Sequence, residues 1–252
     1  MTEEVPDNFV EMPLLAHIRE LKNRLIKVFV FFFLAFCVSY YFADEIYKFL
    51  IQPLADISAE SGRRMIYTNL TEAFFTYMKL AMFAAFFFSF PIIAIQVYLF
   101  LAPGLYAKEK RFLIPFLAAA PLLFFAGAAF VYYFIMPMAW EFFISFESTS
   151  DAAMPIQLEA KVSEYLGLVM HLILGFGISF QLPIILILLA KIGFITPEAL
   201  KKNRKYAFVI IVIVAAILTP PDVISQIGLA SVLYALYEIS ILGAKLINKE
   251  KL

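Results

Sequence analysis

Six apolar segments, most of them long enough to cross a lipid bilayer as a helix, dominate this sequence. The predicted spans are residues 25–43, 73–101, 112–140, 163–190, 206–219 and 223–242. Their apolar residues are continuous, unlike the strands of a membrane barrel, which are about ten residues long and alternate apolar with polar residues. With 63% apolar residues in 252, a soluble domain would lack the interior to bury them. The sequence therefore predicts an all-α polytopic membrane protein, with residues 1–252 forming one integral membrane domain.

Basic residues are distributed unevenly between the two sides of the predicted bundle. One side would carry Arg19, Lys22, Arg24, Lys27, Lys108, Lys110, Arg111, Lys191, Lys201, Lys202, Arg204, Lys205, Lys245, Lys249 and Lys251. The opposite loops hold only Lys48, Arg63, Arg64 and Lys161. Because cytoplasmic loops of membrane proteins are enriched in Lys and Arg, we expect both termini in the cytoplasm.

Prolines and short spans are expected to shape the bundle. Prolines within or beside spans are Pro91, Pro115, Pro121, Pro137 and Pro183, and each removes a backbone donor and bends its helix. They predict a curved, concave bundle. Residues 206–219 would form only about 21 Å of helix against a hydrocarbon core of about 30 Å. In the sixth span, Gln226 and Glu238 leave an uninterrupted apolar core of only 11 residues, 227–237. Two spans this short are expected to thin the bilayer.

A further short helix is expected between the first two spans. Residues 44–51 begin with Asp44 and Glu45, acids that suit a helix N-terminus. This segment is expected to lie as an amphipathic helix on the outer membrane interface, and Pro53 would end it.

The residues that carry chemistry are sparse. The 20 basic and 20 acidic residues give a net charge of zero, so there is no overall electrostatic attraction that would favour binding of nucleic acid. His171 and Ser179 lie eight residues apart, too far to meet within one helix. Cys37 has no cation or base beside it, and His17 and His171 do not stand at metal-ligand spacing. We therefore predict no enzyme, no metal and no cofactor.

Polar side chains at membrane depth are candidates for function because burying them in lipid is costly. They are Lys79, Gln96, Gln181, Gln226 and Glu238. Lys79 is near enough to the outer interface to snorkel, and Glu238 is placed to pair with Lys245 or with a neighbouring helix. Gln181 is deep and needs a hydrogen-bond partner. Contact with a partner helix and packing inside the chain are both open interpretations of Gln181.

Two carboxylates stand within the basic cytoplasmic segments. Glu20 lies between Arg19 and Lys22, and Glu109 lies between Lys108 and Lys110. Glu20 and Arg24 at i and i+4 are compatible with an ordinary solvated pair. The alternative is a pair of carboxylates that bind a cationic ligand, and the planar fork of a guanidinium matches a carboxylate in a way that lysine cannot.

With these motifs, the sequence resembles TatC, the multi-span core of the twin-arginine protein translocase. The resemblance covers about residues 13 to 243. It is carried by Pro13–Leu21, Phe100–Tyr106 with Glu109, Phe180–Pro183, Ile195–Glu198 and Leu218–Val223. The six spans with a short last hairpin, and these motifs in order, are specific when taken together.

The resemblance implies a receptor in a bacterial inner membrane that binds twin-arginine signal peptides of folded passengers. It implies signal-peptide contacts at Glu20, Glu109, His17, Phe100 and Pro103. Gln181, Thr219 and Gln226 would contact the single-span TatA-like and TatB-like partners, and the receptor would self-associate in a larger complex powered by the proton gradient. Position 181 is glutamine where many relatives have glutamate, and position 22 is lysine where arginine is usual. The alternative function is a small-solute transporter or channel with Gln181 and His171 along its path.

Overall fold

The structure, a computed structural model, describes residues 14–58, 64–101, 107–148, 157–219 and 223–249. Within these ranges the regular structure is helical, and an isolated bridge pairs Ile66 with Lys161. The elements in chain order are α1 (Leu14–Tyr41), α2 (Ala43–Ser58), α3 (Glu72–Leu101), α4 (Ala107–Phe130), the π-helical turn η2 (Val131–Ile135), α5 (Met136–Ile144), α6 (Val162–Ser179), α7 (Leu182–Ile192), α8 (Pro197–Lys202), α9 (Arg204–Leu218) and α10 (Val223–Lys249). The all-α prediction is confirmed.

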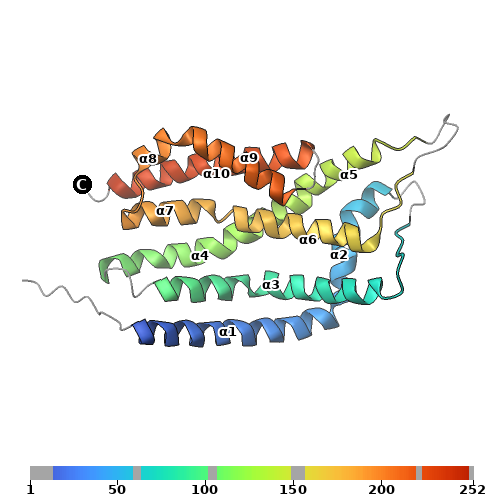
Figure 1. The fold of residues 1–252 in the computed structure, drawn as a ribbon, viewed down its shortest axis with the longest axis horizontal. Coiled ribbons are helices and arrows are strands. Elements are labelled where there is room, and N and C mark those ends of the chain that lie inside the picture. The colour runs from blue at the N-terminus through green and yellow to red at the C-terminus, as the bar shows by residue number, and fades with distance from the viewer. Residues whose placement is uncertain (1–13, 59–63, 102–106, 149–156, 220–222, 250–252) are drawn as a thin grey trace, which may run out of the picture.

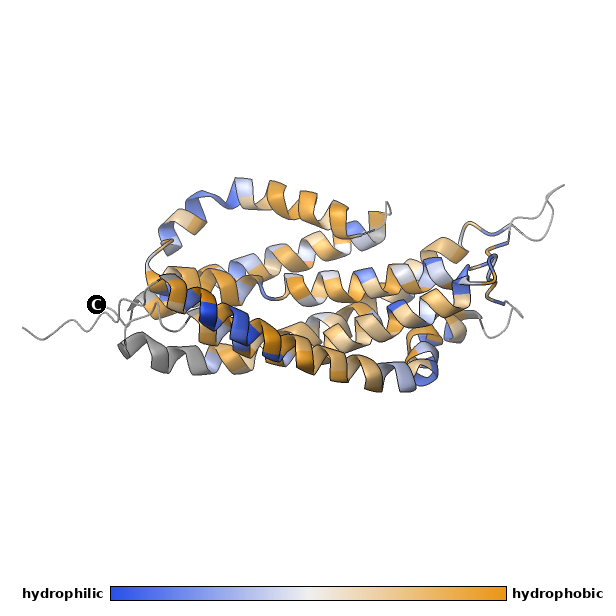
Figure 2. Ribbon diagram, turned by 60° about the horizontal axis from the view of Figure 1, so that its bottom comes forward, coloured by the Kyte–Doolittle hydropathy of each residue, from blue (hydrophilic) through white to orange (hydrophobic). Residues whose placement is uncertain are grey.

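The long helices lie roughly side by side (Figure 1). The helix α1 forms one edge and packs along α3, while α9 and α10 form the opposite edge. The start of α1 and the end of α10 lie at the same end of the molecule, which we call the terminal end. Hydrophobic residues cover most of the helix lengths (Figure 2), as expected for helices that face lipid.

Five membrane-spanning stretches meet the requirements of length and apolarity in the described part of the chain. They are Leu15–Tyr41, Glu72–Phe100, Pro115–Ile144, Val162–Ile192 and Ser225–Ile247. The predicted fifth span corresponds to α9, which has only 15 residues and is too short to be counted with the others. A helix of that length covers about 22 Å, so α9 crosses a full-thickness bilayer only if the bilayer thins around it. The expectation of a short sixth span is wrong, because α10 has 27 residues and contains the full-length span Ser225–Ile247.

The predicted end of α2 at Pro53 is wrong, because the helix continues to Ser58 with Pro53 inside it. Proline lacks the N–H that would bond to the carbonyl four residues earlier, which here belongs to Phe49. The Tyr132 hydroxyl, from η2, donates to the Phe49 carbonyl oxygen at 2.7 Å, and the Tyr132 ring stacks on the Phe49 ring. A distant side chain therefore replaces the missing hydrogen bond and allows the helix to continue.

The predicted 163–190 span is broken in its middle. Helix α6 ends at Ser179, and α7 begins at Leu182 after a turn at Phe180 and Gln181. Pro183 follows the turn and has no N–H to donate to Ser179, so the α-helical pattern cannot pass through this point. The break gives Gln181 its position between two helical segments.

The larger of the two buried clusters joins every helix of the described chain except α1. Phe124 of α4 and Phe176 of α6 are fully buried within the bundle, and Phe124 stacks on Phe90 of α3 with ring centroids 3.7 Å apart. By contrast, only 6% of the α1 span is buried. The helix α1 is therefore a largely lipid-facing edge that contacts the rest of the bundle mainly through α3.

Candidate ligand-binding site at the start of α1

One face of α1 presents polar groups to α3 near the terminal end. Glu20 Oε1 accepts hydrogen bonds from Arg24 Nε, at 3.0 Å, and from Arg24 Nη2. Arg24 Nη1 donates to Gln96 Oε1 of α3 at 3.3 Å. Residues 20 and 24 meet because side chains four apart share one helix face, and Gln96 fixes that face against α3.

The second oxygen of Glu20 is in a different environment. Glu20 Oε2 is buried and, within the described part of the chain, accepts no hydrogen bond. Its nearest ionic partner is His17 Nδ1 at 3.9 Å. The His17 ring in turn stacks on Phe100 near the end of α3, with centroids 4.3 Å apart and planes 20° apart. Oε2 is therefore an unused acceptor for N–H donors, enclosed beside an oxygen that Arg24 already holds.

An open groove of about 460 Å³ runs beside these side chains. It is lined by Ala16, Arg19, Glu20, Asn23, Arg24 and Lys27. All six residues belong to α1, and Glu20 supplies their only carboxylate. The groove therefore gives a ligand access to the Glu20–Arg24 pair along the face of α1.

Of the five predicted signal-peptide residues, the structure brings His17, Glu20 and Phe100 together. Glu109 belongs to the first turn of α4, but its side chain lies outside the described residues, as does Pro103 altogether. The predicted pairing of Glu20 with Glu109 thus stays a prediction. Sequence reasoning missed the contact between Arg24 and Gln96, since Gln96 was noted only as a polar residue at membrane depth.

The three predicted partner-contact residues lie elsewhere. The Gln181 side chain donates from Nε2 to the Ala120 carbonyl oxygen of α4 at 3.0 Å, so its amide is used in internal packing. Thr219 is buried, and its hydroxyl donates to the Ala215 carbonyl oxygen at 2.8 Å. Gln226 is half-buried in the first turns of α10.

Two other polar predictions can be compared with the structure. Glu238 forms an ion pair with Arg204 at the start of α9, at 2.5 Å. Of the two partners considered for Glu238, a neighbouring helix is therefore the one observed, and Lys245 is not. His171 is exposed, and its Nδ1 lies 2.7 Å from the Gly167 carbonyl oxygen of the same helix.

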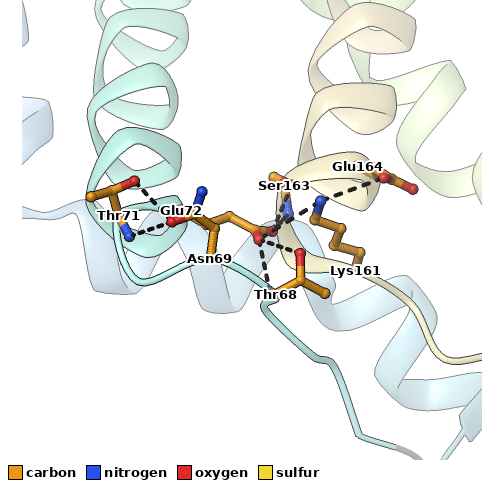
Figure 3. Close-up of polar contacts among 7 residues, drawn as sticks. All are labelled: Thr68, Asn69, Thr71, Glu72, Lys161, Ser163 and Glu164. Atoms are coloured by element: carbon orange, nitrogen blue, oxygen red, sulfur yellow. Dashed lines mark hydrogen bonds and ion pairs between the residues drawn. The ribbon is translucent and has the colours of Figure 1, made fainter.

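A second polar cluster, at the end opposite the terminal end, was not foreseen from the sequence (Figure 3). Glu72, the first residue of α3, accepts hydrogen bonds from the Thr68 N–H at 2.9 Å and from the Ser163 hydroxyl at 2.6 Å. Lys161 Nζ lies 3.8 Å from Glu72 Oε2 and 3.7 Å from Glu164. Backbone hydrogen bonds between Ile66 and residues 160 and 162 join the same two segments. This cluster ties the start of α3 to the start of α6.

Comparison with known proteins identifies the family. A family model described as "Sec-independent protein translocase protein (TatC)" matches residues 16–231. The chain belongs to the TatC family. The resemblance predicted from the motifs is therefore confirmed.

Individual TatC proteins match over nearly their whole length. The chain is 52% identical to the Sec-independent protein translocase protein TatC of Rickettsia prowazekii over 226 residues, which covers 90% of each chain. It is 37% identical to that of Escherichia coli K12, with 91% of this chain and 86% of the relative covered. A crystal structure of the twin-arginine translocase receptor TatC is 37% identical, has a TM-score of 0.78 and covers 92% of this chain and 99% of its own.

Proposed function

We propose that this TatC protein binds the twin-arginine signal peptides of folded passengers, and that Glu20 and Glu109 bind the two signal arginines. The observation that carries the proposal is the guanidinium already seated on Glu20. Arg24 reaches one carboxylate oxygen through two nitrogens, which supports a site whose shape accepts a guanidinium. The Glu20 side chain is 21% exposed, so a charge-assisted hydrogen bond there is screened less than on an open surface.

The proposed site faces the cytoplasm of a bacterial inner membrane. The start of α1, the end of α3 and the end of α10 lie together at the terminal end (Figure 1), and the basic residues of the sequence cluster in the segments at this end. Positive charge favours the cytoplasmic side. A peptide presented by a folded cytoplasmic passenger would therefore meet the α1 groove without crossing the membrane.

We further propose that single-span TatA-like and TatB-like partners pack against α9 and α10, close to Thr219 and Gln226. The outward face of α9 is apolar and exposed at Phe208, Val209, Ile210, Ile213 and Ile217. Because α9 has only 15 residues, a partner beside it would stand in locally thinned membrane. Gln181, through its bond to Ala120, would shape the α6–α7 break. The proton gradient would drive transport by the whole complex. Residues 1–252 would act as one membrane domain.

Substitution of the two carboxylates tests this proposal. In cells that depend on this chain, Glu20→Gln and Glu109→Gln together are expected to reduce export of a twin-arginine passenger at least tenfold, because each removes a charged partner of a guanidinium. Glu159→Gln is the matched control, since Glu159 is exposed near the other end of the bundle. Export by the double variant at the level of the control, with equal amounts of protein in the membrane, would overturn the proposal.

A further inference from the structure

A ligand arginine that binds Glu20 in a bidentate fork needs both carboxylate oxygens, and Arg24 already occupies one of them, Oε1. Its Nε and Nη2 both donate to Glu20 Oε1, and its Nη1 donates to Gln96 Oε1. The side chains of Arg24 and Glu20 are only 20% and 21% exposed. The pair is therefore more than a loose surface contact, and a second guanidinium cannot take the same fork geometry on Oε1 while Arg24 remains there.

We propose that Arg24 is a built-in competitor for the signal-peptide site: its guanidinium occupies Glu20 in the resting receptor and must leave before a signal arginine binds there. This inference rests on the proposed role of Glu20 as a signal-peptide ligand. It assigns to Arg24 the function of setting how tightly any such peptide is held.

The structure also supplies a place for Arg24 when it is displaced. Gln96 and Phe100 are four residues apart and so lie on one face of α3, as His17, Glu20 and Arg24 lie on one face of α1. Arg24 Nη1 donates to the side-chain amide oxygen of Gln96, Oε1, at 3.3 Å, and this bond does not depend on Glu20. A guanidinium has five donors, so Arg24 can release Glu20 and keep the bond to Gln96.

Competition of this kind has a defined thermodynamic signature. When only a fraction of the receptor has Glu20 free, the apparent association constant of every ligand that needs Glu20 equals its intrinsic value multiplied by that fraction. Removing the competitor therefore strengthens the binding of an Arg-Arg peptide and of a Lys-Lys peptide by an equal factor. The ratio of the two affinities, which reflects guanidinium geometry at the carboxylate, stays unchanged.

The test measures peptide affinity with the full chain in lipid nanodiscs. Fluorescent signal peptides carrying Arg-Arg or Lys-Lys are titrated against the wild type, Arg24→Gln and Arg24→Lys. Arg24→Gln is expected to lower Kd for both peptides about three- to tenfold, in keeping with a charge-assisted pair that is partly shielded from water. Arg24→Lys, a competitor without the planar fork, is expected to give a smaller decrease.

Two controls separate competition from other effects. Lys202→Gln removes the same charge from an exposed position on α8, outside the groove, and it is expected to leave Kd within about twofold because only bulk electrostatics change. In a Glu20→Gln background, Arg24→Gln is expected to produce no further tightening, since the competed group is gone.

Weaker binding of both peptides by Arg24→Gln and Arg24→Lys would overturn the inference and make Arg24 a group that positions Glu20. Unchanged affinity in both variants would overturn it as well. The proposed function fails by a different result, namely an Arg-Arg affinity that Glu20→Gln leaves at the wild-type value.

Discussion

Two glutamates, one at each end of the bundle, differ in how fully their oxygens are hydrogen-bonded, which separates a structural carboxylate from the proposed binding one. Both oxygens of Glu72 accept hydrogen bonds, Oε1 from Ser163 and Oε2 from Thr68. Glu20 has its bonds on Oε1 alone, while Oε2 is buried without one in the described part of the chain. A saturated carboxylate holds segments together, whereas one with an unused acceptor keeps capacity for a ligand.

At the Glu72 cluster we expect a loss of stability without loss of peptide binding. Glu72→Gln replaces charge-assisted hydrogen bonds to Ser163 and Thr68 with neutral ones and removes the ion pair with Lys161. The melting temperature of the purified chain in detergent is expected to fall by a few degrees. Glu164→Gln, whose side chain is 78% exposed, is the control and is expected to melt like the wild type. Equal melting of the two variants would show that the cluster does not tie α3 to α6.

At the scale of elements, two glycines lie where α4 and α6 pack against each other, Gly127 on α4 and Gly177 on α6. A Cβ added at Gly177 would lie 2.7 Å from the Phe124 ring, and one added at Gly127 would lie 2.8 Å from the Phe176 carbonyl oxygen. Both distances are shorter than atoms tolerate, so the absence of side chains is what allows the two helices to approach. Small residues serve the same purpose in other membrane helix pairs.

Alanine at these glycines is therefore expected to force the helices apart. Gly127→Ala and Gly177→Ala are each expected to cost about 1–3 kcal/mol by overpacking, measured as a lower melting temperature. The control is Gly167→Ala on α6, where an added Cβ meets nothing within 4 Å. That variant is expected to be neutral or slightly more stable, because alanine favours helix over glycine. A similar decrease in all three variants would contradict the close-packed crossing.

Sequence reasoning reached some elements and missed others for physical reasons. Apolar run length is a local property, so the long spans were predicted well. The continuation of α2 past Pro53 depends on the hydroxyl of Tyr132, which is 83 positions from its acceptor, the Phe49 carbonyl oxygen. No local sequence pattern predicts a contact over that separation. Glu20, His17 and Phe100 were found through motifs. The Arg24–Gln96 contact requires knowing how α1 lies against α3, which only the fold provides.

At the scale of the whole molecule, the two ends of the bundle carry different features. The terminal end carries the α1 groove, the His17–Phe100 stack and most of the basic residues. The opposite end carries the Glu72 cluster and the bridge between Ile66 and Lys161, which fasten loops. The proposed recognition at one end, with fastening at the other, would suit a receptor that meets its ligand from one side of the membrane.

The measurement that tests this account most directly is photo-crosslinking from the α1 groove in membranes that contain the whole chain. A photoreactive residue at Asn23, which lines the groove, leaves Glu20 intact, and the same residue at Leu34, which is 58% exposed farther along α1, serves as the control. With a passenger carrying Arg-Arg, we expect a strong crosslink from position 23 and none from position 34. With Lys-Lys in its place, the crosslink from position 23 should be lost. Equal crosslinks to both passengers, or none to either, would contradict a receptor that recognises guanidinium at Glu20.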